Sequence, residues 1–233
     1  MARMMQGTLA TSNQPLLLTS SVEAWHEAIS LPYSQNIDLL ERLWNASFDD
    51  TESFSVKHAK WKEIGFQNEC PASDFRGGGL LSLQCLVYMA ETYPDTYKAL
   101  AYKKNGPRSE YEYPFAASYI HMVFTLLDTL QLRNLHTVSR YSDGFLRAVM
   151  TQDHEDFSVM FQEMTVQAMI VLDDVWVSSS ASYIDFPSVK EHVCRHMQWV
   201  VSKRWFDNAS LILSEYSSLN NTYTTNNNEK KDS

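Results

Sequence analysis

Apolar residues along most of the chain recur at the spacing of helices. The clearest stripe follows Pro114, and His121, Thr125 and Asp128 lie off it. Its apolar members are Ala116, Tyr119, Ile120, Val123, Leu127 and Leu130. Proline suits the first turn of a helix, because the N–H that it lacks has no partner there in any case. The pattern predicts a long helix with one buried face.

Similar stripes predict further helices on both sides of this one. Ser34 is a candidate N-cap for the second of them. In chain order the other predicted helices cover residues 21–30, about 34–44, 56–64, 80–93, 96–103, 157–176 and 187–206. Strict alternation of apolar and polar residues is scarce, and Gly and Pro number only seven each. The expected fold class is therefore all-α.

Composition divides the chain into a helical domain and two tails. A chain of 233 residues can bury a sizeable core as one domain. Residues 1–20 are polar, and residues 217–233 are rich in Asn, Thr and Ser, so neither end offers enough apolar surface to offset the entropy of ordering. We expect a mobile tail at 1–20, one helical domain at 21–206, and a mostly disordered tail at 207–233.

The charge balance argues against several kinds of partner. Lys and Arg total 19 against 28 Asp and Glu, a net charge of −9, and no dense basic block occurs in the body of the chain. Nucleic acid and anionic lipid surfaces are therefore not expected partners. No apolar run approaches the roughly 20 residues that cross a bilayer, so no integral membrane segment is expected.

Cysteine usage indicates a reducing compartment. Cys70, Cys85 and Cys194 are odd in number and lack CxxC spacing, and no secretory leader is evident. We therefore expect a cytoplasmic location. Cys85 lies among leucines and is expected to act as a small core side chain.

The segment from Trp61 to Leu80 carries the candidate chemistry. An apolar helix end breaks at Gly65, a loop containing Pro71 follows, and three glycines at 77–79 precede the next helix. Glycines leave no side chains to hold a partner surface away. Ser73 or Asp74 can cap backbone amides beside these glycines.

Arg76 stands at the edge of the glycine run. Its guanidinium is always charged and can grip two phosphate oxygens at once, which is what an arginine finger needs when it enters the nucleotide site of another protein. Alternatively, Arg76 closes the loop by a local ion pair with Asp74. Gln67 either orients water or contacts the partner, or it caps the broken helix. Phe66 and Phe75 either pack the base of the loop or serve as exposed anchors.

Two other groups of residues carry weaker signals. His192 and His196 share one helical face, a geometry that can hold zinc, but Cys194 lies elsewhere on the helix and further ligands are lacking. No metal site is expected. Asp173 and Asp174 are interpreted as a solvated edge and a helix-terminal contact rather than a catalytic carboxylate pair.

The motif resembles the signature of the ELMO (engulfment and cell motility) domain family, specifically a short subgroup thought to activate Arf-family GTPases. The matching residues are Trp61, Gly65, Phe66, Gln67, Pro71, Ser73, Asp74, Phe75, Arg76, Gly77, Gly79 and Leu80. Further similar blocks at 113–116, 161–163 and 174–176 extend the resemblance over about residues 35–205. Ser replaces the usual Thr at position 73, Cys70 falls in the variable spacer, and Met89 stands where Phe is frequent.

The resemblance implies an all-α fold and a GTPase-activating role without chemistry of the chain's own. Arg76 would be the finger and Asp74 would orient it. The implied GTPase-contact residues are Phe66, Gln67, Phe75, Gly77, Gly78 and Gly79, and the implied structural residues are Trp61, Gly65, Pro71, Ser73 and Leu80. GTP and Mg²⁺ would belong to the partner GTPase, so no cofactor is expected here.

The same resemblance leaves a second role open. The larger scaffold members of the family partner Dock-type exchange factors for Rac, and they tend to lack the arginine. The alternative is therefore a non-catalytic adaptor that binds such a factor or a GTPase and regulates actin, cell motility or phagocytosis. The larger members also carry armadillo-like and pleckstrin-homology regions, which 233 residues do not accommodate.

Overall fold

The computed structural model describes residues 36–48, 53–76, 78–103, 112–133, 141, 145 and 157–202. Within these residues every regular element is a helix, so the predicted all-α class is confirmed. The predicted helix at 21–30, the cap at Ser34, the two tails and residues 203–206 lie outside the described residues. The elements are α2 (Ile37–Ser47), η2 (Ala59–Ile64), η3 (Pro71–Arg76), α3 (Gly79–Thr92), α4 (Pro94–Ala101), α5 (Phe115–Thr129), α7 (Phe157–Ser178), η6 (Tyr183–Asp185) and α8 (Phe186–Ser202), where η marks a short 3-10 helix.

Several helix boundaries differ from the predicted ones. α2 begins at Ile37, with Asn36 as N-cap, rather than near residue 34. Only Ala59–Ile64 of the segment predicted at 56–64 is helical, and it takes the tighter 3-10 form that short pieces often adopt. α4 begins at Pro94 rather than at residue 96. Proline cannot continue α3 but fits the first turn of the next helix, so it both ends one helix and starts another.

α3 lies inside the bundle and packs against α2, α4, α5 and α7. The predicted face of Leu80, Leu83, Leu86, Val87 and Ala90 is buried, and so are residues on its other sides, including Leu81, Cys85 and Met89. A helix that is apolar all round can satisfy its surface only when neighbours surround it. The predicted core position of Cys85 is confirmed, and burial raises the pKa of its thiol to about 12.

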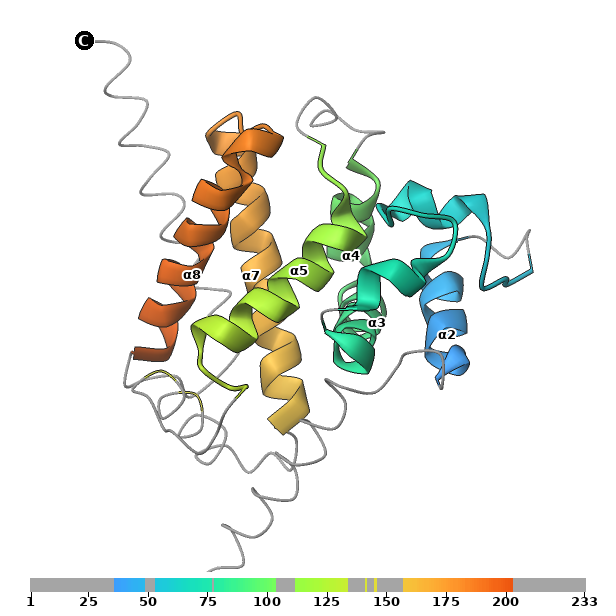
Figure 1. Ribbon diagram of the computed structural model, residues 1–233, viewed down its shortest axis with the longest axis horizontal. Coiled ribbons are helices and arrows are strands. Elements are labelled where there is room, and N and C mark those ends of the chain that lie inside the picture. Colours follow the sequence, from blue (N-terminus) through green and yellow to red (C-terminus); the bar gives the residue numbers. More distant parts are fainter. Residues whose placement is uncertain are drawn as a thin grey trace, which may run out of the picture.

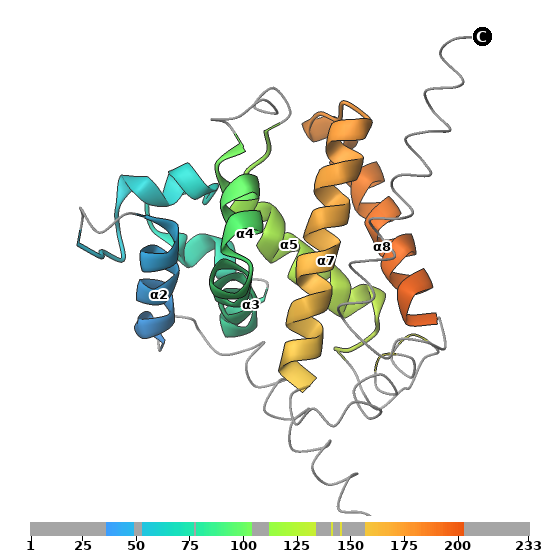
Figure 2. The same cartoon turned by 180° about the vertical axis from the view of Figure 1, so that it is seen from behind.

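α5 crosses the bundle and contacts α3, α7 and α8. It lies in front of α7 in Figure 1 and behind it in Figure 2, while α2 and α8 lie at opposite edges of the molecule in both views. The predicted stripe is buried, but Thr125, predicted to lie off it, is buried as well. Helices cover more than one face of α5, so the buried surface is wider than a single stripe.

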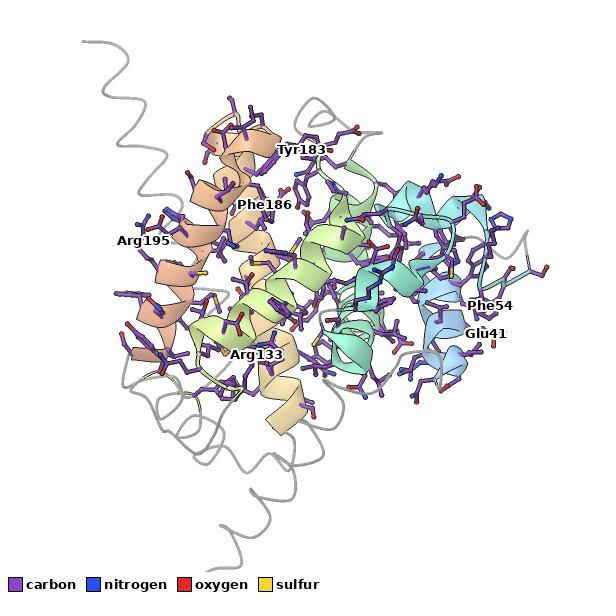
Figure 3. All side chains as sticks on the ribbon, viewed as in Figure 1. Glu41, Phe54, Arg133, Tyr183, Phe186 and Arg195 are labelled. Atoms are coloured by element: carbon purple, nitrogen blue, oxygen red, sulfur yellow. The ribbon has the colours of Figure 1, made fainter. Side chains whose placement is uncertain are left out.

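α7 and α8 form an antiparallel pair joined by η6. The turn is closed by a capping box, in which the Asp185 carboxylate accepts hydrogen bonds from the Ser182 backbone N–H at 2.9 Å and from its hydroxyl at 2.7 Å. Figure 3 shows Tyr183 at the tip and Arg195 on the outer side of α8. The Phe186 ring lies 6.4 Å from Trp176 of α7 and 5.3 Å from His121 of α5, so α8 is fixed against both helices.

Candidate functional site

Gly65 joins the candidate loop to the start of α5. Its φ of 91° is left-handed, which ends η2 and confirms the predicted break. An added Cβ would lie 2.7 Å from the carbonyl carbon of Pro114 and closer still to the nitrogen of Phe115. The Gly65 carbonyl accepts a hydrogen bond from the N–H of Ala117 at 3.2 Å, which satisfies one of the free amides in the first turn of α5. The loop therefore starts from a rigid support.

An aromatic cluster forms the base of the loop. Trp61, Phe66 and Phe75 are 0%, 3% and 2% exposed, and the Phe66 ring lies 5.5 Å from Trp61 and 5.7 Å from Phe75. Pro71 and Leu80 are buried too, as their structural role predicts. Neither Phe66 nor Phe75 is an exposed anchor, so of their two predicted roles the packing role is confirmed, while their assignment to a GTPase-contact surface stays a prediction. Both rings pack beneath the loop, where their apolar area is removed from water.

Two hydrogen bonds close the loop above this base. The backbone N–H of Gln67 donates to Oδ2 of Asp74 at 3.3 Å, and the side-chain amide of Asn68 donates to the Ser73 hydroxyl at 2.9 Å. Asp74 thus binds a backbone amide, although one within the loop rather than at the start of a helix. Asn68 was not predicted, because only its pairing with Ser73 across the loop gives it a role.

Partial burial raises the pKa of Asp74 above its ordinary value. The Gln67 N–H and the charge of Arg76 act in the opposite direction. Asp74 and Arg76 form no ion pair in the described structure, so the closing ion pair considered as an alternative role for Arg76 does not form. Asp74 acts on Arg76 through its charge and through the loop, not by direct pairing.

Arg76 is the last residue of η3, and its side chain is exposed. Its guanidinium makes no hydrogen bond or ion pair with any other described residue. Phe75, directly before it, is buried in the aromatic cluster and fixes the backbone from which Arg76 extends. The side chain of Gln67 is exposed as well. The loop therefore combines a fixed backbone with a cation that is available to another molecule.

The described glycines after Arg76 allow close packing at the start of α3 rather than leaving an open surface. Gly77 lies outside the described residues. Gly78 was predicted to belong to an open contact patch. It is instead buried, and a Cβ there would overlap the Ser82 hydroxyl. Gly79 has a φ of 53°, a left-handed conformation that side chains disfavour, and it starts α3. These glycines let the chain turn closely from η3 into α3.

Asp173 is buried rather than solvated, which corrects its predicted place. It is 2% exposed on α7, forms an ion pair with Lys103, and accepts a hydrogen bond from the Tyr113 hydroxyl at 3.0 Å. The Lys103 ammonium also lies 4.6 Å from the centre of the Tyr113 ring. No local pattern in the sequence signals this burial, because it depends on Lys103 and Tyr113, which come from other segments of the chain.

Glu163 is a second buried carboxylate on α7. It accepts hydrogen bonds from the hydroxyls of Tyr88 and Tyr93, the latter at 2.8 Å to each carboxylate oxygen. Burial, together with this carboxylate, raises the pKa of Tyr93 to about 12. Both hydroxyls therefore stay protonated as donors, and the cluster joins α7 to the end of α3.

Among the residues that the structure describes, none joins the histidines of α8 to complete a set of metal ligands. Cys194 accepts a hydrogen bond from the Thr129 hydroxyl at 3.2 Å, and the His196 ring lies 6.0 Å from Trp199. Burial lowers the pKa of His196. The described part of the chain contains no group of three or more residues placed to hold a metal ion. No described helix has both the length and the apolar content needed to cross a membrane.

The fold and the site together define an all-helical protein that presents one exposed arginine from a closed loop beside glycines. A sequence model of the ELMO/CED-12 family matches residues 23–190, which include the whole loop, and the chain belongs to that family.

Individual relatives agree with this family match. Ankyrin repeat and ELMO domain-containing protein D of Dictyostelium discoideum is 31% identical over 157 residues, 66% of this chain and 12% of that protein. ELMO domain-containing protein 2 of Homo sapiens is 35% identical over 101 residues, 42% of this chain and 34% of the relative. Its Mus musculus counterpart is 25% identical over 177 residues, 72% and 56% respectively. The chain thus spans from 12% to 56% of the length of these relatives. No solved structure gives a significant match.

Proposed function

We propose that this protein accelerates GTP hydrolysis on a small GTPase of the Arf or Arf-like class by supplying Arg76 in trans. The observation that carries the proposal is the exposed guanidinium of Arg76, which makes no ion pair with other described residues and extends from a backbone held by buried Phe75. A cation committed to an internal carboxylate would have to break that pair first. Arg76 has no such cost within the described structure.

The proposed mechanism is electrostatic. The GTPase holds GTP and Mg²⁺, and the reaction develops charge on the transferring phosphoryl group and the leaving oxygen. The guanidinium donates hydrogen bonds to those oxygens and stabilises their charge, an effect worth roughly 10³- to 10⁵-fold in rate. The exposed side chain of Gln67 belongs to the same loop and is proposed to contact the same partner, while its backbone N–H donates to Asp74.

The test is single-turnover GTP hydrolysis on a panel of GTP-loaded Arf and Arf-like GTPases. We expect Arg76→Ala and Arg76→Lys each to reduce the stimulated rate at least about 100-fold, because lysine lacks the planar fork of donors. Arg195→Lys is the matched control, since Arg195 is exposed on the outer side of α8 and pairs with Glu191. An unchanged rate in Arg76→Lys would remove the finger from the mechanism.

A non-catalytic adaptor is the competing role. The chain is 27% identical over 176 residues to engulfment and cell motility protein 3 of Rattus norvegicus, 70% of this chain and 24% of that protein. An adaptor would bind a GTPase or a Dock-type exchange factor without stimulating hydrolysis, and Arg76→Lys would leave that binding intact. Pull-downs with GTP-locked Arf and Rac proteins, run beside the hydrolysis assay, separate the two roles.

A further inference from the structure

The loop before Arg76 is built from three nested residue pairs. Phe66 packs against Phe75, the Gln67 amide binds the Asp74 carboxylate, and the Asn68 amide binds the Ser73 hydroxyl. From one pair to the next, the first residue moves one position toward the C-terminus and the second residue moves one position toward the N-terminus. The arrangement resembles a hairpin in which side chains supply the cross-links, and we call these three pairs the loop ladder.

The loop ladder has one apolar pair and two polar pairs. The Phe66–Phe75 pair is buried and belongs to the core. The Asn68–Ser73 pair, which is nearest the turn of the loop, contributes little to the core, because Asn68 is exposed and Ser73 is only half-buried. Its effect is local: it closes the four residues between positions 68 and 73 into a loop and thereby limits how η3 can unwind.

The same register places Arg76 directly beyond the Phe66–Phe75 pair, at the end of the loop ladder opposite to Asn68 and Ser73. The partner of Arg76 in this sequence of pairs is Gly65, which has no side chain with which to hold it. Gly65 is itself fixed against Pro114 and Phe115. The direction in which Arg76 leaves the loop is therefore set by the pairs before it, since its guanidinium makes no hydrogen bond or ion pair with another described residue.

We propose that Asn68 and Ser73 are positioning residues, whose hydrogen bond holds η3 at its third residue so that Arg76, at the end of η3, leaves the loop ready to enter a partner's nucleotide site. This inference rests on the proposed function, because it assigns the two residues a part in the same reaction. Neither residue needs to touch the GTPase. An arginine that samples many directions must be ordered during each encounter, and even a small misplacement of a reacting group lowers the rate.

The first test measures the hydrolysis rate at saturating concentrations of this protein. We expect Asn68→Ala and Ser73→Ala each to lower that rate about tenfold while the half-saturating concentration changes little. Ser73→Thr keeps the hydroxyl and should retain the rate. Asn68→Asp should recover most of the rate, because the Ser73 hydroxyl can then donate to the carboxylate. Asn45→Ala, at an exposed position of α2, is the control.

The second test asks whether the two residues act through Arg76. In an Arg76→Ala background, Asn68→Ala should have no further effect on the rate. An additional loss there, or a wild-type rate for Asn68→Ala at saturation, overturns the inference. A role in stability alone is excluded by comparing urea unfolding, which should differ little between Asn68→Ala and the control.

A third measurement keeps the inference separate from the proposed function. Backbone ¹⁵N relaxation at Arg76 and hydrogen exchange at the Gln67 amide need no GTPase. Both should report greater mobility in Asn68→Ala than in the wild type, and unchanged values overturn the inference. If the wild type stimulates no hydrolysis, the proposed function fails, and these two amides alone then decide whether the loop ladder positions Arg76.

Discussion

At the scale of single residues, Gly65 has the most constrained position in the site. It combines a left-handed φ of 91° with backbone contact against Pro114 and Phe115. Either feature alone would disfavour a side chain, and together they leave no rotation of the backbone that relieves both. Its carbonyl also caps α5 through Ala117. The residue that turns the loop therefore also ties it to the core.

Replacement of Gly65 by Ala should destabilise the protein by about 2 kcal/mol or more, since it adds left-handed strain and a backbone overlap. Urea unfolding followed by circular dichroism measures the loss. Lys62→Ala, at an exposed position of η2, is the control and should change stability by less than about 0.5 kcal/mol. A Gly65→Ala protein as stable as the wild type would contradict the close packing of this turn on α5.

At the scale of elements, α7 organises the polar interior. It carries Glu163 and Asp173, and each carboxylate is buried with partners from other helices or the segments that follow them. Glu163 receives hydroxyls from the α3 side, and Asp173 receives Lys103 and Tyr113. Because Tyr113 lies two residues before Phe115, the first residue of α5, the Asp173 cluster steadies the same helix end on which Gly65 rests.

The Lys103–Asp173 pair gives a prediction at this scale. Asp173→Asn should cost about 3–5 kcal/mol, because it leaves the Lys103 ammonium, only 6% exposed, without its counter-charge. Lys103→Met should cost a similar amount for the converse reason. The double variant Lys103→Met, Asp173→Leu should cost much less than the sum of the single losses, as replacement of a buried pair by apolar residues often does.

Urea unfolding of the two single variants and the double variant forms the double-mutant cycle. Arg195→Ala, which removes an exposed pair with Glu191, is the control and should cost less than about 1 kcal/mol. Additive losses in the cycle would show that Lys103 and Asp173 do not act as a pair.

At the scale of the whole molecule, the sequence pattern predicted where the helices lie along the chain better than which of their faces are buried. The period of apolar residues identified α5, α7 and α8, because that signal is local. It could not identify which further faces neighbours cover, so Thr125, predicted to lie off the stripe, and Asp173, predicted to be solvated, are both buried. In the site, the break at Gly65 follows from local chemistry, whereas the burial of Phe66 and the pairing of Asn68 depend on contacts across the loop.

One continuous core joins the site to the far edge of the bundle. The buried cluster includes Trp61 beneath the loop and Trp176 beside α8, and α3 and α5 lie between the two. No described helix can lose its packing without exposing apolar surface on a neighbour, so the loop and the α7–α8 pair should unfold in one step.

Labelling with 5-fluorotryptophan tests this cooperativity, because ¹⁹F spectra report each indole separately. The two signals are assigned by Trp61→Phe and Trp176→Phe under native conditions, and the unsubstituted labelled protein is then titrated with urea. We expect the native signals of Trp61 and Trp176 to disappear with the same midpoint, within the error of the fits. An earlier midpoint for Trp61 would mean that the candidate site forms a separate unit. In that case the Lys103–Asp173 variants would lower the free energy of unfolding of the α7 side of the core only, and the loop that supports Arg76 would keep its stability.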